Sequence, residues 1–134
     1  MLMSVKKWVT KMFMGEFKHN IDAKGRLIIP SKLREQCGSS VIVTRGFDGC
    51  LALYTQEGWN DYYQKLQMLP KTKKDARNFV RIITSRASEC EFDKLGRINI
   101  PSVLRVEGKL EKECIIVGVG DKALCLNILA QFHK

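Results

Sequence analysis

The sequence has 134 residues, a mass of 15.3 kDa and a formal net charge of +9. Its hydrophobic content of 45% is that of a folded globular chain and excludes wholesale disorder. No apolar run approaches the roughly 20 residues of a membrane-spanning helix. Residues 1–8 also lack the apolar segment of a signal peptide. We therefore expect a cytoplasmic protein with no membrane partner.

The cysteine content argues against a metal site or a disulfide framework. The number of cysteines is odd, no pair has C-x-x-C spacing, and the only histidines are His19 and His133. Most of the cysteines lie in apolar surroundings, where a reduced thiol acts as a small hydrophobe. The five are Cys37, Cys50, Cys90, Cys114 and Cys125.

The positive charge is concentrated in the first two thirds of the chain. Residues 1–58 have a net charge of +4, residues 59–88 have +5, and residues 89–134 are neutral. A pI near 9.5 with clustered charge is typical of a polyanion-binding protein. From composition alone, a solubilising surface explains the charge equally well.

An internal duplication organises the chain. Residues 22–34 (D-A-K-G-R-L-I-I-P-S-K-L-R) and residues 93–105 (D-K-L-G-R-I-N-I-P-S-V-L-R) share eight residues at the same offsets. The repeated unit is about 43 residues long, within the range of repeat modules. Because one such unit is too small to bury a full core, we expect the copies to interlock or to pair with another chain.

The first copy is predicted to form two hairpins around a short helix. Alternation before Asp22 predicts a strand, and Gly25 lies in the turn that follows. Pro30 ends the second strand, and Ser31 is placed to N-cap the short helix. The second hairpin is predicted from apolar runs at residues 41–43 and 51–54.

Two helices are predicted between the copies. Residues 56–69 have helical apolar spacing, and Pro70 ends it. Thr72, with Asp75 three residues later, resembles a capping box for the second helix. A solvated surface and a phosphate-binding surface explain the basic residues of this second helix equally well. These residues are Lys73, Lys74, Arg77 and Arg81.

The second copy is predicted to repeat the first. Gly96 lies in its turn, Pro101 ends its second strand, and Ser102 is placed to N-cap its short helix. Its second hairpin is predicted from apolar runs at residues 114–117 and 123–126.

The sequence offers little for catalysis. It has no G-x-G-x-x-G, P-loop, G-x-S-x-G or H-E-x-x-H motif, and no Ser or Cys has a recognisable histidine partner. His19 lies on the inward side of a strand pattern, as a packed or edge histidine does. We therefore expect no enzyme activity, no cofactor, no metal and no small-molecule ligand.

The motif that stands out is Asp-x-x-Gly-Arg, at residues 22–26 and again at 93–97. Its structural interpretation is a turn in which Asp binds backbone amides, Gly adopts a positive φ, and Arg pairs with Asp. Its functional interpretation is that Arg26 projects from a rigid turn toward a phosphate or a guanine edge.

Neighbouring charge favours the first copy as the nucleic-acid contact. Its motif is flanked in sequence by Lys18, Lys24, Lys32 and Arg34, whereas Glu89, Glu91 and Leu95 flank the second. Because those acids repel phosphate, Arg97 is predicted to be structural rather than DNA-binding.

These motifs and their surroundings resemble the MraZ family of bacterial transcriptional regulators. The resemblance spans residues 12 to about 126 and depends above all on the duplicated D-x-x-x-R. Further matching segments are M-F-M-G-E (12–16), V-T-R-G-F-D-G-C (43–50), K-K-D-A-R (73–77) and S-E-C-E-F-D (88–93).

The resemblance implies an α+β, mostly β fold. Two tandem SpoVT-AbrB-like swapped-hairpin repeats would form one pseudo-symmetric β-barrel-like core with flanking helices. We expect an N-terminal arm at residues 1–15, repeat 1 at 16–58, linking helices at 59–86 and repeat 2 at 87–130. Relative to the family, residues 1–11 look like a basic extension, and residues 129–134 stand where a Trp-containing helix is usual.

The resemblance also implies a function. Family members form ring-shaped homo-oligomers that bind direct repeats of double-stranded DNA in the promoter of their own division and cell-wall gene cluster, in the nucleoid. The D-x-x-x-R motif is the family's DNA-binding signature. The implied DNA-binding residues are Lys18, Asp22, Lys24, Gly25 and Arg26, with Asp93, Gly96 and Arg97 as secondary or structural positions.

Two alternatives stay open. One is an AbrB-like protein-binding module of the antitoxin type, and the other is a non-specific nucleic-acid-binding protein. A co-purifying partner would indicate the first, and loss of all binding to competitor nucleic acid would indicate the second.

Overall fold

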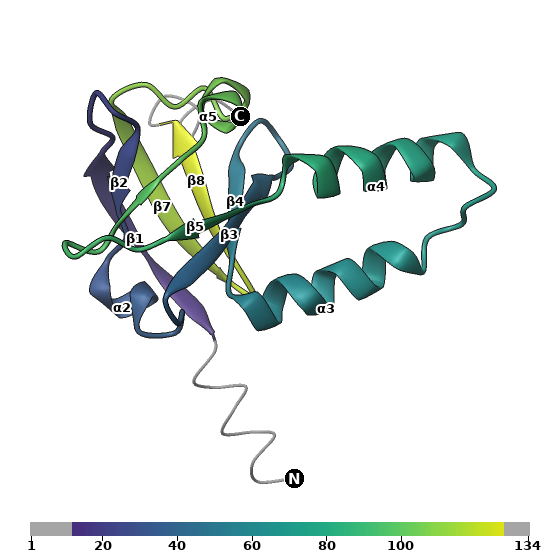
Figure 1. Ribbon diagram of the computed structural model, residues 1–134, viewed down its shortest axis with the longest axis horizontal. Coiled ribbons are helices and arrows are strands. Elements are labelled where there is room, and N and C mark those ends of the chain that lie inside the picture. Colours follow the sequence, from purple (N-terminus) through teal and green to yellow (C-terminus); the bar gives the residue numbers. More distant parts are fainter. Residues whose placement is uncertain (1–11, 128–134) are drawn as a thin grey trace, which may run out of the picture.

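The structure is a computed structural model that describes residues 12–127 (Figure 1). The basic extension at residues 1–11 and the chain end after residue 127 lie outside the described residues. None of the helices in the described part is long and apolar enough to cross a membrane.

Both repeats have the predicted order of strand, turn, strand, short helix, strand, turn and strand, but the first two strands of each repeat belong to different sheets and do not pair as a hairpin. Repeat 1 consists of β1 (Phe13–Asn20), β2 (Arg26–Ile28), α2 (Ser31–Arg34), β3 (Ser40–Arg45) and β4 (Leu51–Tyr54). Repeat 2 consists of β5 (Ser88–Glu91), β6 (Arg97–Asn99), α5 (Ser102–Glu107), β7 (Glu113–Gly120) and β8 (Ala123–Asn127).

The two repeats interlock, as expected for swapped hairpins. The large sheet is antiparallel, with the order β1-β7-β8-β4-β3-β5, and a small sheet pairs β2 with β6. Strands of repeat 1 pair with strands of repeat 2 at β1–β7, β4–β8, β3–β5 and β2–β6. The large sheet curves around the core but is not a closed barrel (Figure 1).

The shared core takes equivalent residues from both repeats. Leu27 and Ile98 face each other across the small sheet and are fully buried. Leu33 of α2 and Leu104 of α5 are also fully buried, as the apolar positions of short amphipathic helices should be. The small sheet therefore packs on a core that both repeats build together.

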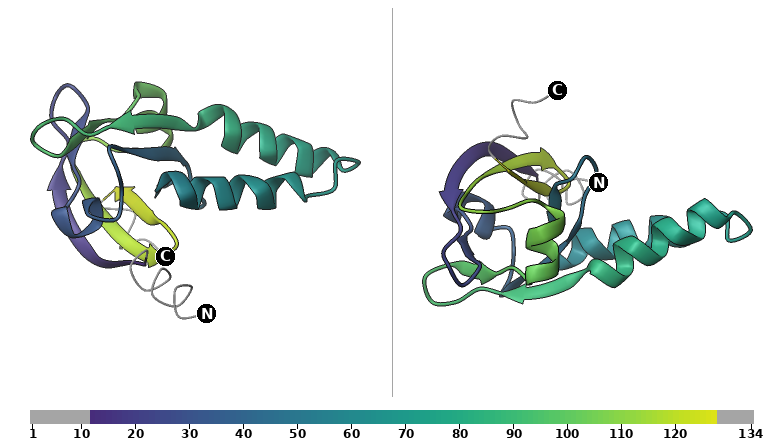
Figure 2. Two further views of the ribbon diagram at one scale, coloured as in Figure 1. Left: turned by 60° about the horizontal axis from the view of Figure 1, so that its bottom comes forward. Right: turned by 90° about the horizontal axis from the view of Figure 1, so that it is seen from above.

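Helices α3 (Gln56–Gln67) and α4 (Lys74–Arg86) form a hairpin that projects from one end of the β-body (Figures 1 and 2). The base of the hairpin is attached by Tyr62, which stacks on Tyr54 at a centroid distance of 5.1 Å. Thr44 Oγ1 also donates to the Ile83 carbonyl oxygen at 2.7 Å. These contacts fix the hairpin to strands β3 and β4.

Three predicted helix caps are wrong. Pro30 and Pro101 occupy the N-cap positions of α2 and α5, and neither helix has a side-chain cap hydrogen bond. Ser31 and Ser102 are instead the first helical residues. The restricted φ of proline sets the helix entry there without a hydroxyl cap.

The third wrong cap is that of α4. Lys73 stands at its N-cap position without a side-chain bond, because Lys73 N donates to the Pro70 carbonyl oxygen and places Thr72 inside the preceding turn. By contrast, Thr55 Oγ1 caps α3 by accepting from Gly58 N at 2.9 Å.

Candidate nucleic-acid interface

The first Asp-x-x-Gly-Arg segment forms a tight turn between β1 and β2. Asp22 Oδ1 accepts the backbone N–H groups of Lys24 and Arg26, each at 2.9 Å. Asp22 Oδ2 accepts from Arg26 Nε at 2.7 Å. Gly25 has a φ of +84°, a left-handed conformation that glycine adopts readily. The predicted structural role of the motif is therefore confirmed.

These hydrogen bonds stabilise the ionised form of Asp22. The backbone N–H of Arg26 has the largest effect, and it holds the pKa of the Asp22 carboxyl below its ordinary value of 3.8. Partial burial opposes this shift, while the Arg26 side chain supports it. The turn is thus organised around a carboxylate that stays charged at neutral pH.

The second turn, between β5 and β6, has the same geometry. Asp93 Oδ1 accepts from the N–H groups of Leu95 and Arg97 at 2.9 Å, and Oδ2 accepts from Arg97 Nε at 2.7 Å. Gly96 has a φ of +78°. The backbone N–H of Arg97 is the main cause of a lowered pKa at Asp93.

The small sheet brings the two turns together. Arg26 pairs with Asn99, and Ile28 pairs with Arg97, in the antiparallel β2–β6 ladder. As a result, Arg97 Nη1 lies 4.0 Å from Asp22 Oδ2 of the other repeat. Both turns lie at the end of the β-body remote from the α3–α4 hairpin (Figure 2). We call this paired surface, residues 22–26 and 93–97, the turn pair.

Because the repeats interlock, each turn gains an arginine from the other repeat, which the order of residues in the sequence does not show. Arg34 of repeat 1 lies against Gly96 of the second turn, and Arg105 of repeat 2 lies against Gly25 of the first. Each turn thus combines one aspartate with three cations. With Lys24 and Lys94 included, six cations and two carboxylates give the turn pair and its two covering arginines a net charge of +4.

The structure does not place more positive charge at the first turn than at the second, contrary to the prediction from sequence neighbours. Arg34, which follows the first motif in sequence, lies against the second turn. Glu89, which precedes the second motif in sequence, accepts from Ser40 Oγ and Gln56 Nε2, each at 2.8 Å, beside α3. Both turns have an excess of positive charge.

A different feature distinguishes Arg26 from Arg97. The Arg26 side chain is 33% exposed and that of Arg97 is 23% exposed, since Arg97 also approaches Asp22. Within residues 12–127, the two terminal nitrogens of Arg26 have no hydrogen-bond partner. A guanidinium held through Nε with two free terminal NH2 groups can bind a phosphate or the O6 and N7 atoms of guanine.

The predicted lysine contacts differ in their placement. Lys24 lies within the first turn, with its backbone held by Asp22 and its side chain exposed. Lys18 is exposed on the edge strand β1 and lines an open hollow with His19, Asn20, Glu113 and Cys114. No hydrogen bond or ion pair joins Lys18 to the turn pair within residues 12–127.

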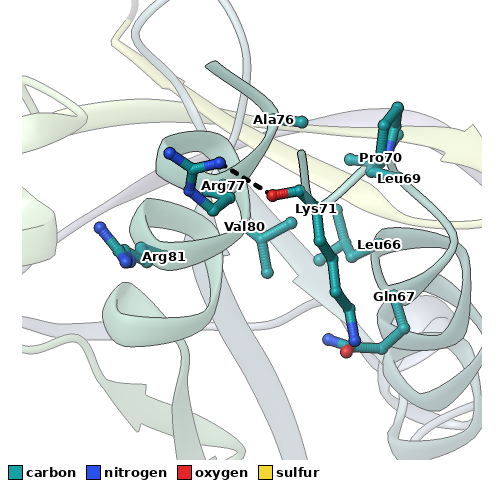
Figure 3. A pocket seen from close by; sticks show the side chains of 9 residues that line it. All are labelled: Leu66, Gln67, Leu69, Pro70, Lys71, Ala76, Arg77, Val80 and Arg81. Carbon is teal, nitrogen blue, oxygen red and sulfur yellow. Dashed lines mark hydrogen bonds between the residues drawn. The ribbon is translucent and has the colours of Figure 1, made fainter. Parts of the chain in front are cut away.

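The helical hairpin has a hollow of its own, of about 230 Å³, near its tip (Figure 3). Leu66 and Leu69 contribute from α3 and the residues after it, and Val80 contributes from α4. Arg77 donates to the Lys71 carbonyl oxygen at 2.8 Å across one rim. Sequence reasoning singled out the basic residues of α4 but not this apolar lining, which arises only when the two helices pair.

The thiols of the described residues are not set up as nucleophiles. All five cysteines are free, and burial raises the pKa of Cys37 and of Cys114 to about 11. Within the described part, no group of three or more His, Cys, Asp or Glu residues could hold a metal ion. His19 lies half-buried on the edge strand β1.

Comparison with known proteins identifies the family. The model of the MraZ protein family matches residues 12–82 and again residues 83–134. The chain belongs to the MraZ family. A relative from Ligilactobacillus salivarius, named transcriptional regulator MraZ, is 63% identical over 111 residues, which cover 83% of this chain and 78% of the relative. A protein of the same name from Limosilactobacillus reuteri is 60% identical over the same shares. MraZ proteins are thus named as transcriptional regulators and not as a class of enzymes.

Proposed function

We propose that this chain is a sequence-specific DNA-binding transcriptional regulator whose turn pair contacts DNA. The observation that carries the proposal is the turn pair itself: two cationic turns side by side, each closed by three hydrogen bonds to its aspartate, with the terminal nitrogens of Arg26 unpartnered within residues 12–127. Preorganised arginines lose little side-chain entropy on binding, which favours specific contacts.

Each residue of the first turn has a distinct role in this proposal. Arg26 reads a guanine edge or clamps a phosphate, and Asp22 orients it through Nε. Gly25 permits the turn, and Lys24 and Lys18 bind phosphates along the strand. In the second turn, Arg97 makes the weaker contact because Asp22 already competes for its charge.

We extend the proposal to the target. In line with the resemblance that the motifs carry, the chain would bind direct repeats in the promoter of its own division and cell-wall gene cluster, as a ring-shaped homo-oligomer at the nucleoid. Several subunits on evenly spaced repeats gain affinity by multivalency, so each turn pair needs to bind only weakly.

The test is binding of the purified protein to its own upstream promoter fragment in the presence of excess non-specific DNA. We expect the wild type to retain the promoter and Arg26→Ala to lose it. Arg81→Ala, which removes the same charge from the exposed face of α4, is the matched control and should bind as the wild type does. All three proteins are first compared for oligomer size and thermal stability.

Two results would contradict the proposal. If competitor DNA removes the wild-type complex, the chain is a non-specific nucleic-acid-binding protein. If Arg81→Ala weakens binding as much as Arg26→Ala does, the DNA-binding surface is on α4 and not at the turn pair. Phosphate contacts also require that affinity fall steeply with salt, so a flat salt profile would argue against them.

A further inference from the structure

The first turn is covered by an arginine from the other repeat. Arg105, on α5, donates from Nε to the Ile100 carbonyl oxygen at 3.1 Å. Its guanidinium lies so close to Gly25 that a Cβ atom there would be 2.6 Å from Arg105 Cζ and 2.8 Å from Nε. The planar guanidinium therefore packs on the bare glycine, and any larger residue would displace it.

The second turn has the reciprocal arrangement. Arg34, on α2, donates from Nη1 to the Ile29 carbonyl oxygen at 2.7 Å. A Cβ atom at Gly96 would collide with the Arg34 guanidinium. The same contact thus occurs twice, and each time the arginine and the glycine belong to different repeats.

Backbone hydrogen bonds link each covering arginine to the turn beneath it. Ile100 N donates to the Gly25 carbonyl oxygen at 2.9 Å, and the Ile100 carbonyl oxygen in turn accepts from Arg105. In the other repeat, Ile29 N donates to the Gly96 carbonyl oxygen at 3.1 Å. Arg105 therefore contacts the first turn directly at Gly25 and is also linked to it by hydrogen bonds through Ile100.

We infer that Arg105 and Arg34 are positioning residues, which hold the turns that present Arg26 and Arg97, respectively, to DNA. The DNA part of this inference rests on the proposed function. A fixed turn leaves the Arg26 side chain fewer orientations in the free protein. Less conformational entropy is then lost when DNA binds. Each repeat thereby depends on an arginine of the other repeat to hold its own DNA-contacting arginine in place.

Phosphate binding by Arg105 itself would be an alternative role, and the lysine variant separates the two. Lysine keeps the positive charge, but it lacks the flat guanidinium that covers Gly25. A positioning role predicts that Arg105→Lys fails to restore what Arg105→Ala loses. A phosphate-binding role predicts that Arg105→Lys restores most of the affinity and that Arg105→Ala lowers the salt dependence by about one counterion.

The first experiment needs no DNA. Amide hydrogen exchange is measured by NMR at Gly25 and Gly96, whose N–H groups donate to the backbone carbonyl oxygens of Asp22 and Asp93 within the turns. Arg105→Ala should speed exchange at Gly25 by about tenfold and leave Gly96 within about twofold. Arg34→Ala is the matched control and should show the opposite pattern. Exchange of both glycines at wild-type rates in both variants would overturn the inference.

The second experiment measures specific promoter binding in a double-mutant cycle. We expect Arg105→Ala to weaken binding by about tenfold in the wild type and to have little effect when Arg26 is already alanine. The coupling of Arg105 to Arg97 should be smaller. Equal, additive losses in all backgrounds, together with rescue by Arg105→Lys, would assign Arg105 to phosphate binding and overturn the positioning role.

The two experiments keep the inference distinct from the proposed function. If the wild type does not bind the promoter specifically, the proposed function fails, while the exchange pattern still decides whether the arginines hold the turns. If Arg105→Ala does not fold, Arg105→Lys gives the same exchange readout at Gly25. Wild-type exchange in that variant would overturn the requirement for a guanidinium.

Discussion

The two turns of the turn pair are nearly identical in backbone and differ in what surrounds their arginines. Gly25 and Gly96 have φ values of +84° and +78°, and both aspartates accept the same three hydrogen bonds. Arg97, however, is less exposed than Arg26 and lies 4.0 Å from the aspartate of the other turn. The motif determines the turn, and the neighbouring repeat determines how available its arginine is.

The outermost residues of the turns differ as well. The position held by Lys24 in the first turn is held by Leu95 in the second, where the side chain is 67% exposed. Lysine at that point adds a mobile cation beside Arg26, whereas leucine offers only apolar surface. The two turns therefore differ in where their lysine stands and not in their total charge, because the second turn has Lys94 one position earlier.

The largest expected effect comes from the core beneath the turn pair. Leu27→Ala and Ile98→Ala each remove a fully buried side chain from the β2–β6 ladder and should cost about 2–5 kcal/mol of unfolding free energy. Because the two residues face each other in this ladder, the double variant should cost less than the sum. Urea unfolding checks this. If only one variant were destabilising, the turns would not share one support.

The next largest effect concerns the glycine positions. Gly96→Ala places a Cβ against Arg34 at a positive φ and should destabilise the protein by about 1–3 kcal/mol. Gly38→Ala is the matched control, because a Cβ there meets no atom within 4 Å. It should lie within about 0.5 kcal/mol of the wild type. Equal thermal midpoints for the two variants would show that the second turn tolerates a side chain.

DNA binding should separate the two arginines more finely. Arg26→Ala should weaken specific binding by about 1–3 kcal/mol, and Arg97→Ala by less, because Arg97 is less exposed and also approaches Asp22. Fluorescence anisotropy with a labelled promoter fragment measures both. An equal loss from Arg97→Ala, in a folded protein of the same size, would remove the preference for the first turn.

The smallest effect is a pH dependence. The lowered pKa of Asp22 and Asp93 means that their hydrogen bonds stabilise the fold above the ordinary carboxyl value of 3.8. This contribution is lost as the pH falls below that value and through the lowered pKa. Thermal midpoints of wild type and Asp22→Asn should therefore differ at neutral pH and converge in acid. A difference that grew in acid would contradict the assigned direction.

Much of the fold follows from local patterns. Alternating residues, the glycine turns and the repeated proline predicted the order of strands, turns and short helix in each repeat, because each feature acts over a few residues of chain. The wrong caps at Ser31, Ser102 and Thr72 have a local cause as well. A proline or a preceding turn can set a helix start without a hydroxyl, and the sequence pattern alone does not distinguish these cases.

The candidate site was less predictable than the fold. The hydrogen bonds that Asp22 and Asp93 accept within their turns were predicted correctly, because all of them lie within five consecutive residues. The covering arginines were assigned to the wrong turn or missed. Arg34 is eight residues from Arg26 in sequence, but hairpin exchange carries it to Gly96.

The sequence by itself thus determined the two turns, their aspartate–arginine pairs and the order of the strands along the chain. Only the tertiary structure decided that the turns lie side by side, that each is covered by an arginine of the other repeat, and that Arg26 is the more accessible of the two. The physical reason is range. A turn is closed by hydrogen bonds between near neighbours, whereas the β1–β7, β3–β5 and β2–β6 pairings join residues that are far apart in the chain and form only when both repeats bury one core.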